Sequence, residues 1–194
     1  VDARLRENEE ANRLFLEMLT SPDDPETALR RLSEAGVLAR FIPAFGRVVA
    51  QMQYDMYHTY TVDEHTIRAI GILNRIEKGE FRDSTPAASD VIGKIVSRRA
   101  LYVAIFLHDI AKGRPEDHSI LGAKIARKLG PRFGFSASET ETIAWLVEYH
   151  LVMSVTAQSR DLGDAKTIGD FADVVQSPER LKLLEILTEA DIAA

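Results

Sequence analysis

The sequence contains no cysteine among its 194 residues. This absence excludes disulfide bonds, thiolate metal sites and a cysteine nucleophile. The 24 Lys and Arg residues are outnumbered by 30 Asp and Glu residues, which gives a formal net charge of −6. A protein that holds nucleic acid usually presents a basic face to the phosphates. We therefore expect no nucleic-acid partner.

The sequence also lacks a long uncharged apolar run. No stretch approaches the roughly 18 apolar residues of a membrane span, and no signal peptide opens the chain. We expect no membrane association and a cytoplasmic location. The chain starts with Val1 instead of Met, in a charged helical pattern, and we expect it to be a piece of a longer polypeptide.

Helical patterns dominate what is present. Prolines at first-turn positions (Pro25 and Pro178) and capping boxes that begin at Thr61 and Ser136 mark helix starts. We predict helices over 4–19, 25–35, 61–78, 90–111, 119–129, 136–150 and 178–191, a buried turn or short helix over 37–46, and a loop over 79–89. No alternating strand pattern appears, so the predicted fold class is all-α.

Two carboxylates stand in apolar surroundings. Asp109 ends the run A-L-Y-V-A-I-F-L-H-D, and Asp191 lies in I-L-T-E-A-D-I-A-A. Burying an unpaired carboxylate costs several kcal/mol, roughly, so each needs a partner. A divalent metal would serve, because carboxylate oxygen and imidazole nitrogen both bind such ions. The chain has five histidines that could share it: His58, His65, His108, His118 and His150.

Each of these residues also has an ordinary interpretation. A lone histidine on an apolar helix is more often a hydrogen-bonded structural residue than a ligand, and His58 could pack among aromatic residues. Asp191 could be a helix-end residue without function. Lys112, three residues after Asp109, could pair with that carboxylate, face solvent, or meet an anionic substrate. The order of a histidine, then His-Asp, then a distant aspartate on helices favours the metal.

The same residues resemble a known family. His65, the adjacent pair His108-Asp109 and the distant Asp191 match the signature of the HD-domain superfamily of metal-dependent phosphohydrolases, which are helical bundles. The longer segments M-Q-Y-D-M-Y-H-T-Y-T-V-D-E-H-T, F-L-H-D-I-A-K-G-R-P-E-D-H-S-I-L-G-A and W-L-V-E-Y-H-L-V-M-S are similar to the central domain of the bacterial uridylyltransferase/uridylyl-removing enzymes. The resemblance implies a helical lead-in over 1–50, packed on an HD-domain bundle over 51–194.

The resemblance also implies roles for individual residues. The primary metal ligands would be His65, His108, Asp109 and Asp191. His118 and His150 fall where two-metal HD proteins place ligands to a second ion, which Asp109 would bridge. With one ion, His118 and His150 would contact the substrate phosphate or donate a proton, and His58 is a third candidate acid. Lys112 would stabilise phosphate charge. The expected cofactor is one or two divalent ions, Mn²⁺ or Mg²⁺, with Fe and Zn open.

In that family this domain removes UMP from a tyrosine of the nitrogen-regulatory protein PII by hydrolysis. Uridylylated PII is therefore the implied partner and UMP the implied product. The nucleotidyltransferase and ACT domains of the family are not visible here, so uridylyl transfer and glutamine sensing do not carry over. Pro115-Glu116 replaces the family's frequent glycines, a change we expect to affect loop stiffness more than chemistry. Hydrolysis of a free nucleotide or cyclic dinucleotide, and a non-catalytic fragment that binds nucleotide or PII, remain alternatives.

Overall fold

The structure, a computed structural model, describes residues 1–52 and 60–194. The described residues form helices and no strand, apart from one isolated bridge between Met52 and Thr61. The all-α prediction is confirmed. In chain order the elements are α1 (Ala3–Arg6), α2 (Glu9–Leu19), α3 (Pro25–Glu34), α4 (Val37–Phe41), α5 (Pro43–Gly46), α6 (Val62–Glu77), α7 (Pro86–Val91), the 3₁₀ turn η1 (Ile92–Lys94), α8 (Arg98–Leu107), α9 (His118–Arg132), α10 (Ala137–Glu148), α11 (Val152–Ser159), α12 (Ala165–Val175) and α13 (Pro178–Ala193).

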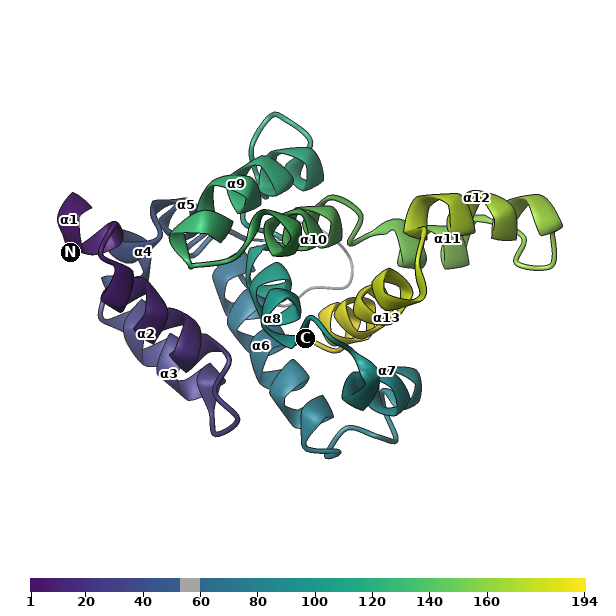
Figure 1. Cartoon of the computed structure of the whole chain (residues 1–194), viewed down its shortest axis with the longest axis horizontal. Helices are drawn as coiled ribbons and strands as arrows, with labels where there is room; N and C mark the ends of the chain where they lie inside the picture. The colour runs from purple at the N-terminus through teal and green to yellow at the C-terminus, as the bar shows by residue number, and fades with distance from the viewer. Residues whose placement is uncertain (53–59) are drawn as a thin grey trace.

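Helix α8 forms the centre of the core. Every residue from Ala100 to Leu107 is buried, because this helix is apolar on all sides and needs neighbours around its whole circumference. Helices α6, α10 and α13 pack against it (Figure 1). The ends of these helices therefore meet deep in the bundle, where polar side chains are shielded from water.

The lead-in helices share this core. Phe15 of α2 packs against Phe106 of α8 with ring centroids 5.9 Å apart, and Phe45 of α5 stacks on Phe106 at 5.5 Å. Arg132 of α9 donates to Asn12 Oδ1 (3.0 Å) and to the carbonyl of Phe41 (2.6 Å). Helices α2, α4 and α5 thus contact the bundle, while the division into a lead-in over 1–50 and a domain over 51–194 stays a prediction.

The predicted helix over 90–111 is wrong at both ends. It is split into η1 and α8, because Glu179 of α13 accepts hydrogen bonds from the amides of Val96 (2.9 Å) and Ser97 (3.1 Å). Those amides are consequently held outside a helix. The preceding loop prediction also missed α7, which begins at Pro86. A carboxylate more than 80 residues away determines this break, and no local pattern contains it.

Other boundaries differ in smaller ways. Helix α9 continues through Pro131, predicted as its end, to Arg132, although proline lacks the amide that would bond to the carbonyl four residues earlier. Gly130 allows close packing there, since a Cβ would overlap the side chain of Thr140 on α10. Ser136 accepts from the amide of Glu139 as a cap (3.2 Å), but Thr61 makes no capping bond among the described residues.

Helices α11 and α12 were not predicted. They pack on each other and on α13, and they extend away from the bundle (Figure 1). None of the helices in the described part of the chain is both long and apolar enough to cross a membrane.

Candidate metal centre

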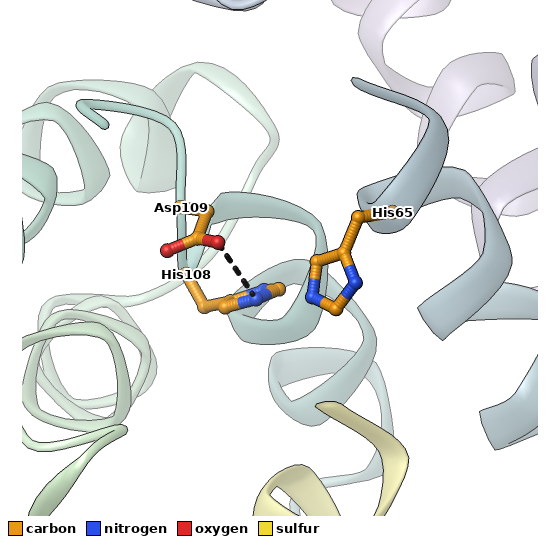
Figure 2. A group of neighbouring side chains, drawn as sticks. All are labelled: His65, His108 and Asp109. Atoms are coloured by element: carbon orange, nitrogen blue, oxygen red, sulfur yellow. Dashed lines mark ion pairs between the residues drawn. The ribbon is translucent and has the colours of Figure 1, made fainter. Parts of the chain in front are cut away.

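Five elements bring the predicted site residues together in the middle of the bundle. His65 comes from α6, His118 is the first residue of α9, and Asp191 lies near the end of α13. His108 and Asp109 directly follow α8, and His150 follows α10 after one intervening residue. Figure 2 shows His65 and His108 side by side, with the carboxylate of Asp109 turned toward the ring of His108.

The histidines after α8 and α10 adopt the same local arrangement. His108 Nδ1 donates to the carbonyl of Ile105 (2.6 Å), and His150 Nδ1 donates to the carbonyl of Val147 (2.7 Å). In a continuing helix the amide of Asp109 would bond to that Ile105 carbonyl. The predicted helix through residue 111 is wrong here for this reason. Because each Nδ1 is used on the backbone, each Nε2 faces the centre of the cluster.

Asp191 contacts two of the imidazoles. Its Oδ1 lies 2.7 Å from His65 Nε2 and 3.3 Å from His108 Nε2. The two rings pack edge-to-face with centroids 5.5 Å apart. Asp191, which is 126 residues from His65 in the chain, therefore lies within hydrogen-bonding distance of it.

Asp109 contacts the remaining members of the cluster. Its Oδ2 lies 3.6 Å from His108 Nε2 and accepts a hydrogen bond from Lys112 Nζ at 3.1 Å. Its Oδ1 lies 3.6 Å from His118 Nε2 and 3.7 Å from His150 Nε2. The pairing of Lys112 with Asp109 is one of the predicted uses of that cation. One carboxylate thus faces three imidazoles and an ammonium group.

The cluster has a buried side and a partly exposed side. The side chains of His65, His108 and His150 are at most 1% exposed, and that of Asp109 is 4% exposed. His118 is 27% exposed and Asp191 is 19% exposed. Solvent therefore reaches the cluster beside His118 and Asp191.

Burial and neighbouring charges shift the pKa values of His108, His150 and Asp109. Burial disfavours a charge on His108, but the negative charges of Asp109 and Asp191 outweigh burial and raise its pKa to about 9. Burial and the charge of His108 lower the pKa of His150 to about 4. Burial alone would raise the pKa of Asp109, yet His108, Lys112 and His150 hold it at about 2. The cluster therefore keeps its carboxylates ionised and places positive charge beside them.

This donor set fits a divalent cation. His65, His108 and Asp109 present ligand atoms that all lie within 4.8 Å of one another, and so do Asp109, His118 and His150. Two ligands about 2.1 Å from one ion lie roughly 3.0–3.4 Å apart for angles between 90° and tetrahedral, close to several of the separations here. His108 Nε2 is buried without a well-formed hydrogen bond among the described residues. A cation would satisfy that atom and both carboxylates.

His58, predicted as a possible acid, lies outside the described residues. Arg114 was not predicted as a functional residue; burial, followed by the charge of Arg47, lowers its pKa. The signal that could have identified Arg114 is the Gly-Arg-Pro triplet that follows Lys112.

The sequence matches known proteins along its whole length. Residues 62–194 match the HD domain, and residues 1–41 match the uridylyltransferase GlnD third domain. Relatives called bifunctional uridylyltransferase/uridylyl-removing enzyme are 68% identical in Azospirillum brasilense and 64% identical in Novosphingobium aromaticivorans, each along the full chain. One from Rhodospirillum rubrum is 66% identical over 98% of the chain. The chain spans about a fifth of the length of these relatives, 20–21%.

Proposed function

The chain belongs to the HD-domain family, and we propose that its His/Asp cluster hydrolyses the phosphodiester that joins UMP to a tyrosine of the signalling protein PII. The names and identities of the relatives support this uridylyl-removing activity over other phosphodiester hydrolyses. The reaction belongs to bacterial nitrogen regulation and would take place in the cytoplasm. Residues 51–194 would be the hydrolase domain and residues 1–50 its lead-in.

One observation carries the metal requirement. The backbone carbonyls of Ile105 and Val147 hold the Nδ1 atoms of His108 and His150, so both Nε2 atoms face Asp109. Such backbone bonds are the usual means of orienting a metal-ligating histidine. A structural role alone gives no reason for several imidazoles to converge on one buried and one partly exposed carboxylate.

The ligands fall into two groups that share Asp109. His65, His108, Asp109 and Asp191 would hold the first ion, Mn²⁺ or Mg²⁺ in preference to Fe or Zn. His118 and His150 would hold a second ion, with Asp109 between the two. A bound divalent cation supplies positive charge that activates water for attack and neutralises the phosphoryl oxygens.

The side chains around the ion positions contribute further steps. Lys112 holds Oδ2 of Asp109 in place and brings a positive charge to the edge of the site, where the phosphodiester carries negative charge. The tyrosine oxygen leaves with a pKa of about 10, so a weak acid suffices to protonate it. His118 is the partly exposed imidazole of the cluster and would donate that proton if only the first ion binds.

The function is tested by mixing the metal-loaded chain with uridylylated PII and measuring free UMP with and without chelator. Release that stops with chelator and returns with Mn²⁺ is the expected result. Parallel reactions with a cyclic dinucleotide and with free nucleotides separate the other phosphohydrolase activities. Turnover of those compounds without release from PII would contradict the substrate proposed here. Tight metal binding without turnover of any phosphodiester would favour a binding role.

A further inference from the structure

Arg114 lies in the loop between Lys112 and α9, and its neighbours restrict its backbone. Gly113 has φ of +81°, and a Cβ at this position would overlap the side-chain amide of Gln51. Only glycine fits here without moving Gln51. Pro115 follows Arg114, and a residue before proline has a reduced range of backbone conformations. Gly113 and Pro115 thus restrict the backbone conformation from which the Arg114 side chain extends.

The guanidinium of Arg114 lacks an acceptor within the part of the chain that the structure describes. Its Nε atom is buried there without a hydrogen-bond partner, which is destabilising for a charged donor. Burial and the nearby charge of Arg47 both lower the pKa of Arg114, and Glu116 opposes them. A buried guanidinium donor without an acceptor is suited to an anionic ligand.

Two contacts connect the neighbours of Arg114 to the metal centre. Lys112, two residues before Arg114, reaches Asp109 Oδ2 at 3.1 Å. Gln51, which packs on Gly113, accepts a hydrogen bond from the amide of Val62 at 2.9 Å, and Val62 begins the helix that carries His65. The segment from Arg47 to Gln51 and the loop from Lys112 to Arg114 therefore lie together beside the cluster.

We propose that Arg114 forms an anion site that holds the phosphate oxygens of the nucleotide beside the metal centre. The planar guanidinium donates two parallel hydrogen bonds to a phosphate, which gives its buried Nε atom a partner. Lys112 donates a hydrogen bond to Asp109. Arg114 would therefore be the donor to those phosphate oxygens that face away from the metal ligands. The identity of the nucleotide rests on the proposed function, but the anion site requires no turnover.

The proposal is tested by calorimetric titration of the metal-loaded chain with UMP, inorganic phosphate and uridine. Arg114→Gln should raise the dissociation constants of UMP and of phosphate by at least about tenfold, as the loss of a charge-assisted hydrogen bond predicts. Arg114→Lys should be intermediate, because it keeps the charge and loses the planar fork. The weak binding of uridine should not change.

The matched control is Arg31→Gln, which removes an exposed arginine on α3 and should bind both anions like the wild type. Metal content is measured for every variant. Unchanged phosphate binding in Arg114→Gln would overturn the proposal, and so would a loss confined to UMP, which would assign Arg114 to the nucleoside. Loss of metal would assign it to the metal centre instead. These titrations give an answer even if the chain releases no UMP from PII.

Discussion

The ends of α8 and α10 are built alike, yet the histidines that follow them hold protons very differently. His108 and His150 each donate from Nδ1 to a carbonyl three residues earlier, and both are buried. The pKa of His108 is raised to about 9, whereas that of His150 is lowered to about 4. Identical local geometry therefore coexists with opposite electrostatics.

The difference comes from what each Nε2 meets. His108 Nε2 lies between two carboxylates, 3.3 Å from Asp191 and 3.6 Å from Asp109. His150 Nε2 lies 3.7 Å from Asp109, and the charge of His108 acts against its protonation. The backbone thus determines where the ring points, and distant helices determine its charge.

The largest effect is expected from removing Asp109, because the Nε2 atoms of both His108 and His150 lie close to its carboxylate. Asp109→Ala should abolish metal retention and lower UMP release by at least about 1,000-fold, since several kcal/mol of charge stabilisation is lost. Metal analysis and UMP release measure this directly. Circular dichroism should show a helical bundle, and an active, metal-free variant would contradict the account.

Replacing His108 and His150 separately should weaken binding of the first ion to different extents. His108→Gln removes a ligand that faces two carboxylates and should weaken binding of the first ion by more than about 100-fold, whereas His150→Gln should weaken it by about tenfold or less. Titration of each chelator-treated variant with Mn²⁺ measures both constants. Equal losses would mean that the two helix ends contribute in the same way.

The free energy of unfolding of the metal-free protein should depend on pH in two ranges, an alkaline limb from His108 and an acidic limb from His150. The stabilisation from His108 is complete below its unfolded pKa of 6.5 and is lost as pH rises through about 9. The stabilisation from neutral His150 is complete above 6.5 and is lost as pH falls through about 4. Each limb amounts to roughly 3 kcal/mol of unfolding free energy.

Urea unfolding in chelator at a series of pH values measures these limbs. From these two groups alone, stability should be greatest near the ordinary histidine pKa of about 6.5. His108→Gln should remove the alkaline limb and His150→Gln the acidic one. A variant that removes the opposite limb would show that the two protonation states are assigned the wrong way round.

A smaller loss of activity than that of Asp109→Ala is expected at the exposed side of the cluster. His118→Asn should leave the first ion bound and lower UMP release by roughly 10- to 100-fold, the usual size of a lost acid–base contribution. If His118 instead holds a second ion, the number of bound ions falls from two to one. Metal stoichiometry measured beside the rate distinguishes these roles, and unchanged activity would exclude both.

Local sequence signals predicted the helices that begin with a recognisable capping residue, such as α10, which Ser136 caps. The adjacent pair His108-Asp109 and the lone Asp191 also indicated a shared partner from residue type and apolar surroundings alone. The break before α8 could not be predicted, because it depends on Glu179 of a distant helix. The end of α8 depends on a hydrogen bond from the His108 side chain to the carbonyl of Ile105, which takes the place of a helical backbone bond. The spacing of apolar residues does not predict such a bond.

The most direct test of the metal centre is the number of metal ions that the chain retains. Wild-type protein and Asp109→Asn, which keeps the side-chain shape and removes the charge, are loaded with Mn²⁺, passed through gel filtration and analysed by mass spectrometry for metal. We expect one or two ions per wild-type chain and none in the variant. Equal retention by both proteins, or none by the wild type, would contradict it.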